Sequence, residues 1–311
     1  MRLRRLKPKG RSVVYHCISR IVGGSFLLGE VEKEVFRRMM WKQSQFCGVE
    51  VVAYCLMSNH VHLAVRVPAE QELPDGELIR RLGILYGSNH PITKNATSFV
   101  RNGEKIPKAI HETFSSRMGD VSEFNKELKQ RFSRWYNRVH QRHGTLWAER
   151  FRSIVVEPSF AALQALIAYI DLNPVRAGLV EDPMDYRFCS YSEALAGRRD
   201  LQLVLMDALG CSSWAECANR YRRLLFVKSG IAGGSGKQVL SERLIRSKLK
   251  KGAALSFGEV LRVRIRYFSK GIVLGSSEFV HEFFRNYREY FGRRPRFETG
   301  RLPDPLRLQS L

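Results

Sequence analysis

Residues 50–67 read EVVAYCLMSNHVHLAVRV, two apolar runs separated by the pair Ser58-Asn59. β-Branched and aromatic residues fill both runs, and small polar residues between such runs are typical of a tight turn. The stretch therefore predicts a β-hairpin with strands over 50–57 and 60–67.

The second strand of this hairpin begins with the pattern His60-Val61-His62. Side chains two residues apart on a strand point to the same face, so both imidazoles project together while Val61 points into the core. Two imidazoles in this arrangement can bind one metal ion. A bare His-x-His also occurs as two solvent-facing surface residues, and the pattern alone leaves both interpretations open.

Strand and helix patterns surround the hairpin on both sides. In chain order, the predicted elements cover 12–21, 30–46, the two hairpin strands, 124–141, 150–157 and 159–171. The first six match the split βαβ arrangement, so we expect an α+β fold with a ferredoxin-like core, an antiparallel sheet and helices on one face. Residues 68–120 contain scattered Pro, Gly and Asn and are expected to form an insertion with one helix around 76–86.

The pattern changes after residue 195. We expect a first domain over 1–195 and a second, mostly helical region over 196–311 that begins with the Gly/Ser linker KSGIAGGSGKQ. Helical patterns around a Gly-containing turn at 255–291 are typical of a helix-turn-helix, which would read a major groove. A helical hairpin that only packs on the first domain fits the same pattern.

Positive charge dominates the composition. Lys and Arg number 52 against 30 Asp and Glu, which gives a formal net charge of +22. Such an excess repels itself in the compact state, and a polyanion relieves the repulsion, so nucleic acid is the expected partner. No apolar stretch is long enough to span a bilayer and no export signal follows the basic N-terminus, so we expect a cytoplasmic protein without a membrane partner.

Tyr169 lies near the end of the last predicted helix of the first domain. The apolar stripe of that helix comprises Phe160, Leu163, Leu166, Ile167 and Ile170. At about 100° per residue, Tyr169 falls roughly 120° from the centre of the stripe, with Asn173 one turn further along. We therefore expect Tyr169 outside the surface that packs the core. A tyrosine that only covers the side of the helix, with a solvated hydroxyl, fits the same position.

Histidines and a tyrosine together can cleave a nucleic acid strand. A tyrosine hydroxyl is a poor nucleophile at its ordinary pKa, but it can attack a phosphodiester that a divalent cation polarises. Two histidines and one amide or carboxylate oxygen leave coordination positions for phosphate oxygens. A covalent phosphotyrosine conserves the bond energy for rejoining, so no nucleotide cofactor is expected.

Three motifs in this order resemble one family. AYCLMSNHVHL at 53–63, RHGTLWAERFRSIVVE at 142–157 and YIDLNPVRAGLV at 169–180 are similar to motifs of the REP-associated tyrosine transposase branch of the single-tyrosine HUH transposases. The resemblance covers about residues 12–195 apart from the insertion at 68–120. It implies metal-dependent cleavage and transfer of single-stranded or hairpin DNA through a covalent 5′-phosphotyrosine.

The resemblance also implies roles for individual residues. His60 and His62 resemble the metal-binding pair, and Tyr169 resembles the nucleophile. Asn173 matches the position of a third metal ligand. The implied metal is Mg²⁺ or Mn²⁺, because phosphate oxygens suit either and imidazole favours Mn²⁺. A monomer and a homodimer are both compatible with the motifs.

Basic residues at several places are candidate DNA contacts. The span 220–270 alone contains fourteen Lys or Arg against two Glu, a net charge of +12. The candidates are Arg2, Arg4, Arg5, Arg150, Arg152, Arg262, Arg264, Arg266 and Lys270. Phosphate contact and solvated surface charge both fit these residues.

Two other functions compete with the transposase. A domesticated, non-catalytic protein that binds DNA hairpins or has a regulatory role would keep the same fold. The intact histidine pair and Tyr169 argue against a decayed site. An HUH replication initiator or relaxase would share the chemistry. Proteins of that kind commonly carry further tyrosines near the nucleophile or a helicase domain, and neither is visible in this sequence.

Overall fold

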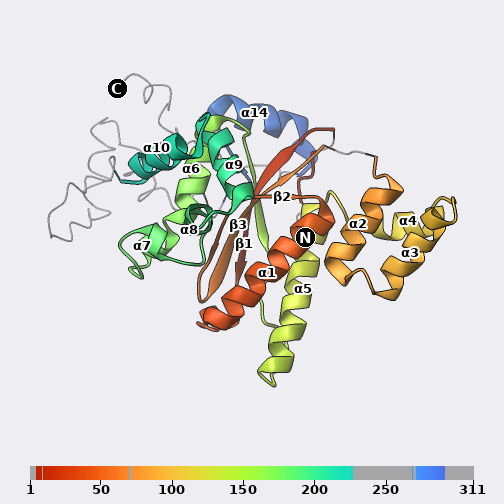
Figure 1. Cartoon of the computed structure of the whole chain (residues 1–311). Coiled ribbons are helices and arrows are strands. Elements are labelled where there is room, and N and C mark those ends of the chain that lie inside the picture. Colours follow the sequence, from red (N-terminus) through yellow and green to blue (C-terminus); the bar gives the residue numbers. More distant parts are fainter. Residues whose placement is uncertain (1–4, 9, 70–71, 227–267, 269–270, 291–311) are drawn as a thin grey trace. The chain divides into compact units, whose positions relative to one another are not determined.

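A computed structural model describes residues 5–8, 10–69, 72–226, 268 and 271–290. The fold is α+β, as expected, with a five-stranded sheet in the order β2-β3-β1-β4-β5 (Figure 1). Its strands are β1 Val13–Arg20, β2 Glu50–Leu56, β3 His60–Val67, β4 Arg152–Val156 and β5 Val273–Leu274. β1 pairs with β3 in antiparallel fashion, as a split βαβ core requires. The hairpin prediction is confirmed.

The chain divides into two compact units. Lys7–Val51 and Leu56–Arg152 form one, which we call the histidine unit. The described residues within Met1–Leu6, Val52–Cys55 and Ser153–Leu311 form the other, which we call the tyrosine unit. The predicted domain boundary after residue 195 stays a prediction.

Two long helices form the body of the histidine unit. α1 (Glu30–Cys47) and α5 (Val121–Val139) lie side by side (Figure 1). Their contact is aromatic: the rings of Phe36 and Phe132 meet edge to face, with centroids 5.0 Å apart, and Trp147 lies against both. The Trp147 indole N–H donates to Ser133 Oγ at 2.9 Å. The TLWAE part of the second motif therefore has a packing role.

The insertion contains three helices, whereas only one was expected. α2 spans Asp75–Tyr86, α3 spans Pro91–Arg101 and α4 spans Lys108–Ser115. Pro91 occupies the first turn of α3, where a proline is compatible with a helix, and His90 caps that turn by accepting from the Ile92 N–H. The proline and the polar residues that follow it are also typical of a loop, so the sequence does not predict α3.

Arg117 fixes the insertion to the rest of the histidine unit. Its guanidinium donates to the hydroxyl of Tyr86 at 2.9 Å and to Glu127 Oε2 at 2.7 Å, and it lies 4.8 Å from the ring centroid of Phe46. Glu127 is buried, and Gln43 also donates to it at 3.0 Å. A buried ion pair stabilises only when further hydrogen bonds support it, and Tyr86 and Gln43 supply two of them. The insertion is thus a folded part of the unit, tied to α1 and α5.

Helices dominate the tyrosine unit. They are α6 Phe160–Asp171, α7 Asn173–Arg176, α8 Ser190–Leu195, α9 Arg199–Leu209, α10 Trp214–Phe226 and α14 Ser277–Asn286. Ser159 caps α6 as predicted, since its Oγ accepts from the Ala162 N–H at 3.3 Å. Across the described parts of both units, no helix has the length and apolar character needed to cross a bilayer.

The predicted helix-turn-helix is corrected in part. Most of its first helix, 255–267, lies outside the described residues. The second is α14, and Ser276 caps it. The expected connecting turn is wrong, because it contains β5, which pairs in parallel with β4. Gly275 follows β5 where an added Cβ would come within 2.7 Å of both Glu157 and Phe279, so glycine allows this close approach.

Candidate active site

β3 begins at His60, and its pleat directs His60 and His62 to one face. Their ring centroids lie 5.0 Å apart, with the ring planes at 83°. His62 is only 4% exposed and His60 is half-buried. The surface interpretation of the pair is therefore wrong for His62, which lies inside the protein.

Each of the two histidines has a partner for its Nδ1 atom. Nδ1 of His62 lies 2.9 Å from Nε2 of His16, a fully buried residue of β1, and the two rings lie within 22° of parallel. Nδ1 of His60 lies 2.6 Å from Oδ1 of Asn59. When Nδ1 carries the proton, the lone pair lies on Nε2, the atom that a metal would accept. The Oδ1 of Asn59 accepts from Nδ1 of His60 and so selects the tautomer in which Nε2 of His60 can ligate. His62 has the same tautomer when its Nδ1 donates to Nε2 of His16.

The donor set fits part of a metal site. Among the described residues, no group of three or more His, Cys, Asp or Glu side chains is placed to hold a metal. The His60 and His62 imidazoles supply two nitrogen donors, and each is oriented by a second hydrogen bond, as metal-ligating histidines usually are. The remaining donors would have to be oxygens of another kind, such as an amide, water or a phosphate.

Tyr169 lies in the last turn of α6, and its predicted position outside the core is wrong. The residue is 2% exposed, whereas Phe160, expected in the apolar stripe, is 62% exposed. Residues 165–171, about the last two turns of α6, are all buried, so this end of the helix has no polar face on which Tyr169 could lie. Its ring stacks on that of Phe268, with centroids 4.5 Å apart and planes at 11°.

Arg176 contacts Tyr169 from α7, seven residues further along the chain. Its Nη2 donates to the carbonyl oxygen of Tyr169 at 2.6 Å, and its guanidinium carbon lies 4.4 Å from the ring centroid of Tyr169. Burial lowers the pKa of Arg176, and the neighbouring Tyr169 opposes this shift. Nη1 of Arg176 is buried and makes no hydrogen bond with the described residues. An unused charged donor thus lies beside the tyrosine.

Asn173 begins α7, directly after α6. Its side-chain Nδ2 donates to the carbonyl oxygens of Tyr169 and Ile170, both at 3.1 Å. These bonds fix the amide against the tyrosine turn. The structure thus brings Tyr169, Asn173 and Arg176 together in the tyrosine unit, and His16, His60 and His62 together in the histidine unit.

Three candidate DNA contacts lie among the described residues. Arg150 and Arg152 are exposed, and Arg152 forms an ion pair with Glu149 at 3.3 Å. Arg5 is half-buried. Their role in DNA binding stays a prediction. The other candidates, Arg2, Arg4, Arg262, Arg264, Arg266 and Lys270, lie outside the described residues.

Comparison with known proteins finds only distant structural similarity. No protein-family model matches the chain, and no curated sequence is detectably similar to it. Among solved structures, the chain is similar to the REP-associated tyrosine transposase bound to a REP hairpin. The TM-score is 0.41 and the identity 16%, over 63% of this chain and 86% of that one.

A buried carboxyl group joins the tyrosine helix to its neighbours. Asp171 is fully buried, and its Oδ1 accepts from Ser190 Oγ at 2.6 Å and from the Tyr191 N–H at 3.1 Å. Its Oδ2 accepts from the Tyr221 hydroxyl at 2.7 Å. Asp171 thereby ties the end of α6 to α8 and α10. Burial raises its pKa from 3.8 to about 6, against the lowering effect of these hydrogen bonds.

The raised pKa of Asp171 predicts a pH dependence of stability. The folded protein holds this proton more tightly than the unfolded chain does, so the contribution to stability is complete below about pH 4 and is lost as pH rises through about 6. The loss corresponds to about 3 kcal/mol. Asp171→Asn should flatten the free energy of unfolding between pH 4 and 6 in urea titrations, whereas exposed Asp185→Asn should not. Parallel curves for all three proteins would contradict this account.

Proposed function

We propose that this chain is a metal-dependent, single-tyrosine enzyme that cleaves and transfers strands of single-stranded or hairpin DNA. The observation that carries the proposal is the histidine pair. His60 and His62 share one face of β3, and Asn59 and His16 hold their Nδ1 atoms. Histidines oriented by a second hydrogen bond are typical of metal sites. The three sequence motifs give independent support.

The proposed metal donors are Nε2 of His60, Nε2 of His62 and Oδ1 of Asn173. When bound, Mn²⁺ or Mg²⁺ would polarise the scissile phosphate and offset the charge that develops on its oxygens. A donor set with two imidazoles matches Mn²⁺ better than Mg²⁺.

Tyr169 is the proposed nucleophile. Its oxygen attacks the phosphorus of a phosphodiester and loses its proton, while the bond from phosphorus to the 3′ oxygen breaks and that oxygen leaves as a protonated 3′-hydroxyl. The 5′-phosphate stays on Tyr169 until another 3′-hydroxyl displaces it. Arg176 stabilises negative charge on the tyrosine oxygen and the phosphate, because its guanidinium lies over the ring and its Nη1 has no protein acceptor among the described residues.

A second function, non-catalytic binding of DNA hairpins, is favoured by one observation. Tyr169 is 2% exposed and its ring is covered by Phe268. A nucleophile must contact its substrate, so strand cleavage requires this ring to become accessible. A protein that only binds DNA has no such requirement.

An adduct assay with end-labelled DNA decides between the two functions. The full chain is incubated with Mn²⁺ and hairpins that carry single-stranded flanks, drawn from repeats around its gene. Attack on the 5′-phosphate side predicts a protein adduct on denaturing gels when the label is at the 3′ end, and a free shortened strand when it is at the 5′ end. Tight hairpin binding without adduct or cleavage in Mn²⁺ or Mg²⁺ would establish the binding protein instead.

A further inference from the structure

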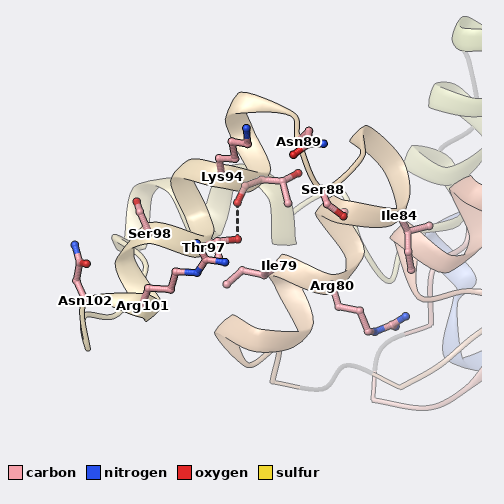
Figure 2. Close-up of a pocket in the computed structure, with 12 residues that line it drawn as sticks. Ile79, Arg80, Ile84, Ser88, Asn89, Lys94, Thr97, Ser98, Arg101 and Asn102 are labelled. Atoms are coloured by element: carbon pink, nitrogen blue, oxygen red, sulfur yellow. Dashed lines mark hydrogen bonds between the residues drawn. The ribbon is translucent and has the colours of Figure 1, made fainter.

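The insertion carries a groove that the proposed chemistry does not use. It lies between α2, the turn that follows α2, and α3, and it has a volume of about 920 Å³ (Figure 2). Its lining includes three cationic side chains, Arg80, Lys94 and Arg101, and no carboxylate. Six further lining residues carry a hydroxyl or an amide. The groove is therefore cationic and rich in hydrogen-bonding groups.

This cationic character is local. Residues 68–120 contain seven Lys or Arg and seven Asp or Glu, so the insertion as a whole has no net charge. Arg80 is paired with Glu77 through two hydrogen bonds of 2.7 Å. Lys94 and Arg101 are exposed and form no ion pair with the described residues. None of the balancing acids lines the groove, which leaves the charges of Lys94 and Arg101 available to an anion.

One face of α3 forms a wall of the groove. Lys94, Thr97, Ser98 and Arg101 recur at intervals of three and four residues and so lie along the same side of the helix (Figure 2). No acidic residue occurs in α3.

Thr93 provides an independent indication of a ligand. It lines the groove and is 3% exposed, yet its Oγ1 has no hydrogen-bond partner in the described structure. Thr97 donates to the carbonyl oxygen of Thr93 at 2.8 Å, so the hydroxyl of Thr97 is used elsewhere (Figure 2). A buried hydroxyl without a partner is costly in the free protein, and a bound acceptor would satisfy it.

We propose that this groove binds the phosphodiester backbone of a DNA substrate. The choice of DNA rests on the proposed function, while the anion-binding character rests on the groove itself. Lys and Arg, and the hydroxyls and amides of Ser, Thr and Asn, commonly contact DNA phosphates, and all of these residue types line this groove. Its volume exceeds what one phosphate ion needs, and its polar lining differs from the apolar pockets that hold small molecules. Arg117 fixes the groove to the unit that carries His60 and His62.

The test compares two double variants that each remove two positive charges from the insertion. Lys94→Gln with Arg101→Gln changes the groove, and Lys105→Gln with Lys108→Gln changes exposed positions outside it. The affinity for a labelled hairpin with single-stranded flanks is measured by fluorescence anisotropy over a range of salt concentrations. The groove variant should weaken binding and reduce the slope of log affinity against log salt by about 1.4 to 1.8, the value for two phosphate contacts. The control should keep the wild-type slope.

Thr93→Val provides a test without any change of charge. It should raise the thermal unfolding midpoint, because an unsatisfied buried hydroxyl is removed, and it should still weaken DNA binding. Equal losses in both double variants would assign the effect to general charge and overturn the proposal, as would an unchanged slope in the groove variant. The same variants are also titrated with poly-glutamate. If the groove variant loses affinity for poly-glutamate but keeps its affinity for DNA, the groove binds an acidic protein partner and the proposal is overturned. If DNA binding depends on the groove but no adduct forms, the enzyme proposal is rejected and the groove proposal stands. If an adduct forms and the groove variant keeps the wild-type salt slope, the groove proposal is rejected and the enzyme proposal stands.

Discussion

Replacing Tyr169 with phenylalanine is expected to abolish the covalent protein–DNA adduct and to slow strand cleavage by about a thousandfold or more. The change removes only the hydroxyl oxygen that we propose as the nucleophile. The ring keeps its stacking on Phe268 and its contact with the guanidinium of Arg176, so the fold of the tyrosine unit should be preserved. The adduct assay on denaturing gels measures the first effect, and single-turnover cleavage measures the second.

Tyr136→Phe is the matched control for this prediction. Tyr136 is also buried, and its hydroxyl contacts the Leu27 carbonyl oxygen at 3.4 Å, which is a packing role. Each variant loses one buried oxygen. A difference in adduct formation between them therefore reflects the chemical role of Tyr169 and not a loss of stability. Tyr136→Phe should keep adduct formation. An adduct that persists in Tyr169→Phe would move the nucleophile to another residue and end the proposed mechanism.

Replacing His62 with alanine should lower the affinity for Mn²⁺ by at least about a hundredfold. Loss of an outer partner of a metal ligand typically costs 10- to 100-fold, and loss of a ligand should cost more. His16→Phe should lower the affinity for Mn²⁺ by only about 10- to 100-fold. It removes the hydrogen bond to Nδ1 of His62 but leaves His62, the proposed ligand, in place. Isothermal titration with Mn²⁺ measures both effects without reference to catalysis.

Stability must be followed in the same variants. His62→Ala leaves Nε2 of the fully buried His16 without this partner, at a cost of about 1–3 kcal/mol in the free energy of unfolding. His60→Ala avoids that cost, because His60 is half-buried and its Nδ1 partner Asn59 lies beside a turn. If His60→Ala and His62→Ala both fold and both bind Mn²⁺ as the wild type does, the pair is not a metal site.

Local sequence patterns predicted the elements that carry the site. The hairpin at 50–67 was readable because two β-rich runs meet at a Ser-Asn turn, and α6 because Ser159 caps a continuous apolar stretch. These signals lie within a few residues of the structure they specify. β5 consists of two residues whose strand character depends on pairing with β4, more than a hundred residues earlier, so no local signal could reveal it.

The burial of Tyr169 could not be predicted for the same reason. A helical wheel assumes one buried side, whereas the end of α6 is surrounded, and the ring that covers Tyr169 belongs to Phe268, 99 positions later. His16 was missed because its significance depends on strand register. It pairs with Ala64 and reaches His62 diagonally, a relation that exists only once β1 and β3 are aligned.

The diagonal contact between His16 and His62 forms only when β1 and β3 pair in the correct register. A slip of β1 by one residue against β3 would turn His16 to the opposite face and leave His62 without its partner, although the amount of strand would hardly change. Far-ultraviolet circular dichroism would therefore not distinguish such a sheet from the native one. The proposed affinity for Mn²⁺ depends on the contact between His16 and His62, which lie 46 residues apart in the sequence. A metal titration during refolding would therefore test both the proposed site and the alignment of the two strands.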